Sequence, residues 1–107
     1  MIVLNNSSSL KLVLGAAPSA EAQYYVSYSN SMDNSLGLTT GVSDGTTDVT
    51  MLNLPSYNLV HPQTISVYNA ASGTIDVTIK INDTILIKQS VSAGGTLLYS
   101  HKVWSVV

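Results

Sequence analysis

The length, composition and charge of the chain restrict what it can be. Its 107 residues suit a single domain with one modest core. Only 9% of them are charged, against about 25% in ordinary soluble domains, the net charge is −2, and arginine and cysteine are absent. This composition excludes a disulfide framework, a cysteine zinc site and a basic nucleic-acid-binding face. No apolar run approaches the ~20 residues of a membrane span. We therefore expect neither nucleic acid nor a membrane as a partner.

The first nine residues, MIVLNNSSS, have an apolar start and a polar continuation. We interpret residues 1–9 as an N-terminal arm and residues 10–107 as a single β-sandwich domain. The apolar residues Ile2, Val3 and Leu4 on a polar tether suit an arm that reaches a neighbouring subunit and adds a strand to its sheet. We therefore expect residues 1–9 to contact another chain rather than their own core.

The rest of the chain alternates between apolar and polar residues, which is typical of β-strands. No window of 11 or more residues has the 3.6-residue period of an amphipathic helix, so we expect no helix longer than two turns. A long connection with two prolines separates the two halves, at residues 55–63. The predicted fold is all-β, a small antiparallel sandwich or barrel, jelly-roll-like, with seven to nine short strands. The predicted strand segments are 10–16, 22–29, 36–47 (a short strand and a glycine-rich loop), 48–54, 64–70, the hairpin 74–91, 95–100 and 102–107.

The hairpin at residues 74–91 permits two registers. A two-residue turn at Asn82-Asp83 would pair Ile79 with Leu86. A register shifted by one residue matches the apolar faces better, because it pairs apolar residues with each other, and it needs Thr84 in the loop or a bulge nearby. We favour the second register, with the pairs Ile81–Ile85, Ile79–Ile87 and Ile75–Val91.

Three groups of residues resemble catalytic or metal sites. The stretch GVSDG, Gly41 to Gly45, matches the nucleophile elbow around Ser43, but that motif needs a following helix and here a strand follows. His61 and His101 lie in predicted loops and form no metal-binding motif. Asp44 and Asp48 lack the spacing of a calcium loop. We therefore expect no enzyme activity, no catalytic residues, no cofactor and no metal.

The aromatic residues suggest packing rather than catalysis. Tyr24, Tyr25 and Tyr28 could form a sugar-binding platform, but strand alternation divides them between two faces. Trp104 is the only tryptophan, on an apolar closing strand, and we expect it to anchor the core or a subunit interface. The candidate interface and packing residues are Ile2, Val3, Leu4, Tyr25, Tyr99 and Trp104.

The C-terminal half, TISVYNAASGTIDVTIKINDTILIKQSVSAGGTLLYSHKVWSVV, resembles small all-β virion structural proteins of tailed bacteriophages. The shared pattern is a strand ending in Tyr-Asn, a small-residue turn, an alternating hairpin, a glycine before Leu-x-Tyr and a terminal tryptophan strand. The N-terminal stretches SLKLVLG, YYVSYSNS and GVSDGTTDVTML resemble the opening strands and threonine-rich loop of the same proteins. In this sequence the matching residues are Tyr68-Asn69, Ala71 to Gly73, the hairpin 74–91, Gly95, Leu97 or Leu98 with Tyr99, and Trp104.

This resemblance implies a capsid decoration, or cement, protein, or a component of the neck or tail, and no catalytic residues. We expect a non-enzymatic protein located in the virion and made in the host cytoplasm. Its expected partners are the major capsid protein or other virion proteins, and further copies of itself in a trimer or dimer. The alternative is a neck, tail or tail-fibre β-sandwich module that binds a virion partner or a host carbohydrate.

Overall fold

The protein is all-β in a computed structural model that describes residues 2, 4, 8–31, 33–53 and 60–107. These residues contain no helix, and hence none that could cross a membrane. The strand count agrees with the upper end of the prediction. The strands are β1 (Ser9–Leu14), β2 (Ala22–Asn30), β3 (Leu36–Ser43), β4 (Val49–Asn53), β5 (Val60–Tyr68), β6 (Ile75–Ile81), β7 (Thr84–Val91), β8 (Thr96–Ser100) and β9 (Val103–Val106).

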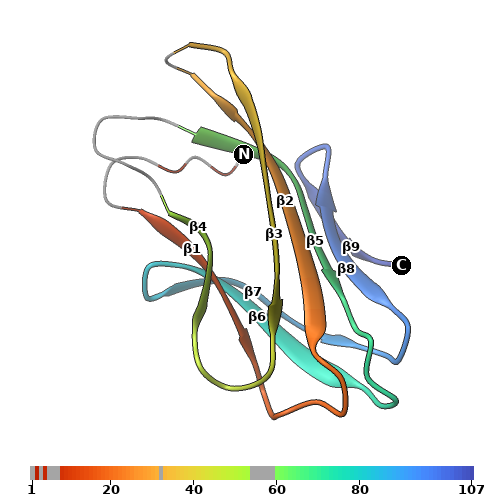
Figure 1. The fold of residues 1–107 in the computed structure, drawn as a ribbon. Helices are drawn as coiled ribbons and strands as arrows, with labels where there is room; N and C mark the ends of the chain where they lie inside the picture. The colour runs from red at the N-terminus through yellow and green to blue at the C-terminus, as the bar shows by residue number, and fades with distance from the viewer. Residues whose placement is uncertain (1, 3, 5–7, 32, 54–59) are drawn as a thin grey trace.

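The strands form two antiparallel sheets packed as a sandwich (Figure 1). The four-stranded sheet has the order β4-β1-β6-β7, and the five-stranded sheet has the order β3-β2-β5-β8-β9. The predicted sandwich is confirmed, and the barrel alternative is not observed, because the sheets stay separate. The edge strands of the described sheets are therefore β3, β4, β7 and β9.

The chain crosses from one sheet to the other five times, between β1 and β2, β3 and β4, β4 and β5, β5 and β6, and β7 and β8. The connection from β4 to β5 includes residues 54–59, which lie outside the described residues. The other four crossings lie at the same end of the sandwich, at the bottom of Figure 1. Backbone hydrogen bonds join them: the Leu14 amide donates to the Gly45 carbonyl at 3.1 Å, and the Gly15 amide donates to the Asp76 carbonyl at 2.9 Å. This end of the molecule is thus tied together within one chain.

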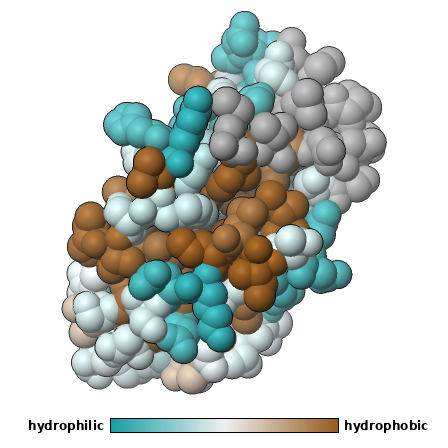
Figure 2. All heavy atoms as spheres, turned by 180° about the vertical axis from the view of Figure 1, so that it is seen from behind, coloured by the Kyte–Doolittle hydropathy of each residue, from teal (hydrophilic) through white to brown (hydrophobic). Residues whose placement is uncertain are grey.

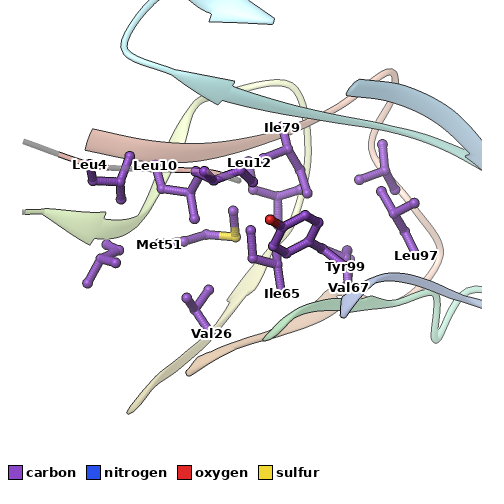
Figure 3. Close-up of a cluster of buried hydrophobic side chains, with 14 of the residues drawn as sticks. Leu4, Leu10, Leu12, Val26, Met51, Ile65, Val67, Ile79, Leu97 and Tyr99 are labelled. Atoms are coloured by element: carbon purple, nitrogen blue, oxygen red, sulfur yellow. The ribbon is translucent and has the colours of Figure 1, made fainter. Parts of the chain in front are cut away.

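Alternation along the strands places one row of apolar side chains between the sheets (Figure 3). Leu10, Leu12 and Ile79 from the four-stranded sheet face Val26 and Ile65 from the five-stranded sheet, and all are fully buried. Each such side chain contributes roughly 1.5–3 kcal/mol relative to leaving it in water. The period-2 pattern of the sequence therefore yields a single core.

The expectation that the N-terminal arm avoids its own core is wrong for Ile2 and Leu4. Ile2 and Leu4 belong to the buried cluster, and Leu4 has no exposed surface. The Leu4 amide donates to the Val60 carbonyl at 2.9 Å, and the Val60 amide donates to the Leu4 carbonyl at 2.8 Å. The physical reason is that Val60, the first residue of β5, offers both backbone hydrogen-bond partners to Leu4, and the apolar cluster buries the Leu4 side chain. Val3 lies outside the described residues.

The proline-containing connection is shorter than predicted, because β5 begins at Val60 rather than near Thr64. Proline lacks an amide and is therefore confined to sheet edges and bulges. Pro62 satisfies both conditions: it faces Tyr28 at a register shift, and β8 pairs only with Thr64–Tyr68. The remaining residues of the predicted connection, 55–59, lie outside the described ranges.

The hairpin of β6 and β7 combines features of both expected registers. Ile79 pairs with Ile87 and Ile75 pairs with Val91, as favoured, but Ile81 pairs with Thr84 and not with Ile85. Asn82 adopts a positive φ of 53° in the tight turn, and a bulge between Ile79 and Lys80 restores the apolar register. The bulge reconciles the turn chemistry with the burial of one face.

Candidate interaction surface

The large apolar side chains that remain exposed concentrate on the edge strands. A strand edge presents unpaired backbone groups, so exposed apolar residues there are suited to contact another chain. Figure 2 shows the molecule from behind, where a band of apolar atoms crosses the face between polar regions. The exposed large apolar residues are Leu36, Leu38 and Val42 of β3, Ile85 and Leu86 of β7, Val103, Val106 and Val107 at β9, and Tyr25 and Tyr68 on β2 and β5.

One continuous group of these residues lies on the outer face of the five-stranded sheet, and we call it the β3 surface: Leu36, Leu38, Val42, Tyr25 and Tyr68. Leu36 is 82% exposed, Leu38 56% and Val42 47%. Strand pairing brings the residues of the β3 surface together, since Tyr25 of β2 pairs with Thr40 of β3 and with Ser66 of β5. The β3 surface contains no charged side chain.

The inner side of β3 is covered by two tyrosine rings. Gly37 lies opposite Tyr28, and Gly41 lies opposite Tyr24. A Cβ atom at either glycine would overlap the ring of its tyrosine, so each ring lies directly over a glycine. Aromatic rings over edge glycines supply the packing that the glycines lack. The two rings therefore extend the apolar interior up to the last strand of the sheet.

A shallow hollow of about 450 Å³ opens on the β3 surface. Tyr25 and Tyr68 line it together with the polar side chains of Gln23, Thr40 and Ser66. Of the predicted tyrosine platform, only Tyr25 belongs to this outer face as an exposed side chain, whereas Tyr24 and Tyr28 pack against the core. The expected division of the three tyrosines between two faces is confirmed.

Tyr99 and Trp104, two of the predicted packing residues, contact each other. Tyr99 of β8 is buried, and Trp104 of β9 is half-buried against the core. They are paired across the β8–β9 ladder, with ring centroids 4.9 Å apart and planes tilted by 48°. Tilted aromatic pairs add about 0.5–1.5 kcal/mol to the burial itself. The structure thus places Trp104 as an anchor of the short edge strand β9.

The two histidines, which the sequence could not bring together, line one hollow of about 720 Å³. His61 lies on β5, and His101 lies in the β8–β9 turn, where His101 and Lys102 both have positive φ. Among the described residues, no acidic side chain lines this hollow. The Nδ1 atom of His61 is buried without a hydrogen-bond partner in the described part of the chain, so it is not open to a ligand in the hollow. No group of three or more potential metal ligands occurs among the described residues.

The serine of the elbow-like stretch is not presented as a nucleophile. Ser43 ends β3, its side chain is buried, and its hydroxyl donates to the Gly45 carbonyl at 3.5 Å. A strand follows, as expected for a glycine-rich turn. Of the two aspartates, Asp48 forms an ion pair with Lys80, with 3.0 Å between Oδ2 and Nζ.

Asn69 is a structural residue whose role sequence reasoning missed. Its buried side-chain amide donates to the carbonyls of Gly73 and Val91 at 2.8 and 2.9 Å, and its Oδ1 accepts from the Ala71 amide at 2.9 Å. Its backbone carbonyl also accepts from the Gly94 amide at 2.9 Å. Asn69 therefore fastens the β5–β6 crossing to the β7–β8 crossing. The Tyr68-Asn69 pair, which ends a predicted strand, was the feature of the sequence that could have indicated this role.

Comparisons with known protein families, with characterised proteins and with solved structures give no match to this chain. The functional argument therefore depends on the residues and their geometry.

Proposed function

We propose that this chain is a non-enzymatic structural protein of a bacteriophage virion that decorates and cements the capsid shell as a homo-oligomer. The observation that carries the proposal is the β3 surface, an uncharged and apolar surface on an unpaired strand edge. The sequence resemblance to small virion proteins supplies the setting. In this proposal the partners are the major capsid protein and further copies of the chain.

The physical chemistry of the surface supports this role. Few charges on the surface mean little desolvation cost when it is covered by a partner. A cement protein binds the assembled shell and not its separated subunits, so binding stabilises the shell by mass action. Exposed apolar residues on β3, β7 and β9 offer contacts on more than one side of the sandwich, which suits a subunit held between neighbours.

The hollow on the β3 surface favours one alternative, a tail or tail-fibre module that binds a host carbohydrate. Tyr25 and Tyr68 offer exposed aromatic rings beside the polar side chains of Gln23 and Ser66. Sugars bind through such combinations of an apolar ring face and a few polar groups. The same two tyrosines would contact a protein partner in the cement role, so an experiment has to separate the two.

The experiment adds purified protein to phage shells prepared without it and measures occupancy by electron microscopy and shell rupture by heating. The cement proposal predicts bound protein and a higher rupture temperature. The double variant Y25A/Y68A should keep most shell binding, because Leu36, Leu38 and Val42 remain. A protein that never binds shells, but binds a glycan array and loses that binding in Y25A/Y68A, would replace the cement role by the carbohydrate-binding alternative.

A further inference from the structure

The edge strand β3 differs from the other edges in having no protection against pairing. Natural sheets block their edges with charges, prolines, bulges or short strands. β7 carries Lys88 and a bulge, β4 has five residues with a register shift, and β9 has four residues. β3 has eight residues with no charge and no proline, and its eight pairs with β2 run without a shift.

The sequence of β3 is also nearly symmetric about Thr39. In an antiparallel pair, residues directly opposite each other share a face of the sheet. A two-fold axis perpendicular to the sheet must therefore lie between one residue and the same residue of the second copy. An axis at Thr39 places Leu36 opposite the second copy's Val42, and Leu38 opposite the second copy's Thr40. On the inner face it places Gly37 opposite the second copy's Gly41, which leaves room for the tyrosine rings of both copies.

The neighbouring registers fit less well. An axis at Thr40 places Leu36 opposite the second copy's Asp44, and an axis at Leu38 places Val42 opposite Asn34, outside the strand. The axis at Thr40 also joins apolar residues, Leu38 with Val42, but only the axis at Thr39 keeps all residues from 36 to 42 within the paired segment. No like charges meet in this register, although each copy has a net charge of −2.

We propose that two copies of the chain pair through β3, antiparallel about a two-fold axis at Thr39, and so join their five-stranded sheets into one. This inference deepens the proposed function, because it names the second copy as the partner of β3. It would make the smallest oligomer a symmetric dimer. The pairing would give partners to the outward backbone groups of each β3, which pair with no other strand in the described part of the chain, and would cover part of Leu36 and Leu38.

The test is sedimentation velocity of the full chain over a concentration series. The wild-type chain should form a dimer. The variant L38K/T40K places lysines directly opposite each other across the axis, and we expect the dimer to dissociate at least about tenfold more readily, since facing like charges repel. Both positions are exposed, so the variants should keep the circular dichroism and melting temperature of the wild-type monomer.

The register is tested by restoring the dimer. In L38K/T40E each lysine faces a glutamate of the second copy only if the axis lies at Thr39, and we expect near wild-type dimerisation. L38K/V42E would restore the dimer only with the axis at Thr40. The variant I85K, on the other long edge strand, is the matched control and should leave the dimer unchanged.

Three results would overturn the proposal. They are a monomeric wild type at every concentration, a dimer that L38K/T40K does not weaken, and a dimer that I85K weakens as strongly. Amide hydrogen exchange gives a second readout, because β3 amides should become protected as concentration rises. A monomer that still coats phage shells would overturn the pairing and the homo-oligomer but leave the shell-cementing role intact, whereas a dimer that never binds shells would overturn that role and leave the pairing intact.

Discussion

The leucines of the interior and those of β3 differ completely in environment, although they stand in similar alternating strands. Leu10 and Leu12 of β1 have no exposed surface, whereas Leu36 of β3 is 82% exposed. The interior is complete within one chain, and its polar groups at the crossings are satisfied by the bonds of Asn69. The outward side chains of β3, in contrast, stay exposed in the described part of the chain. The comparison teaches that apolar alternation creates strands, while the position in the sheet decides whether the apolar residue serves folding or association.

The largest expected effect is at the crossings of the complete region. Asn69→Ala removes three side-chain hydrogen bonds and leaves the Val91 carbonyl and the Ala71 amide buried without them. Each unsatisfied buried group costs about 1–3 kcal/mol, so the two together should lower the free energy of unfolding by about 2–6 kcal/mol. Urea denaturation measures this loss. A variant as stable as the wild type would show that Asn69 does not hold the crossings together.

The second prediction compares two leucines directly. Leu4→Ala should lower the free energy of unfolding by about 2–5 kcal/mol, because Leu4 is fully buried. Leu36→Ala should change it by no more than about 0.5 kcal/mol, because the side chain is exposed and away from the core. Thermal and urea denaturation of dilute protein measure both. Equal effects would mean that Leu4 does not lie in its own core.

The third prediction sharpens the boundary between core and edge. Gly41→Ala forces the Tyr24 ring away from its place over β3 and should cost about 1–3 kcal/mol. Gly73→Ala is the matched control, because a Cβ atom there meets nothing within 4 Å and the φ of Gly73 is not positive. The two melting temperatures are compared. If both variants melt alike, the ring does not rest on the glycine.

The smallest effect concerns the turn that leads into β3. The Ser35 hydroxyl and the Ser35 amide, 2.9 Å from Oδ1, hold the pKa of Asp33 below its ordinary value of 3.8. A lowered pKa in the folded state stabilises the fold above the unfolded-state pKa, and that stability is lost as pH falls through the folded-state pKa.

Melting curves of the wild type and Asp33→Asn test this linkage. The wild type should melt slightly higher at neutral pH, and the difference should shrink below about pH 4, where the carboxylate takes up its proton. Because Asp33 is fully exposed, salt should also reduce the difference. A constant difference across this range would show that the Asp33 charge has no part in it.

Part of the candidate surface could be predicted from the sequence. Strand alternation predicted a strand in the uncharged run LGLTTGV at residues 36–42. It also predicted that Tyr25 lies on the face opposite to Tyr24 and Tyr28. The sequence did not show that β3 is an edge strand, because a strand's neighbours are set by pairings between residues far apart in the chain. For the same reason it did not show that Tyr24 and Tyr28 cover Gly41 and Gly37. Strand pairing is nonlocal, so no local pattern identifies the edge.

The sequence by itself determined the all-β class, most strand positions and two of the three favoured apolar pairs of the 74–91 hairpin, because period-2 alternation and turn residues act locally. Only the tertiary structure decided that Leu4 is a core residue, that β5 continues through Pro62, and that Asn69 joins two crossings. Each of these depends on what lies opposite the residue: Val60 for Leu4, a bulge facing Tyr28 for Pro62, and the Val91 carbonyl for Asn69. Burial and hydrogen bonding are properties of pairs, and the partners here are distant along the chain.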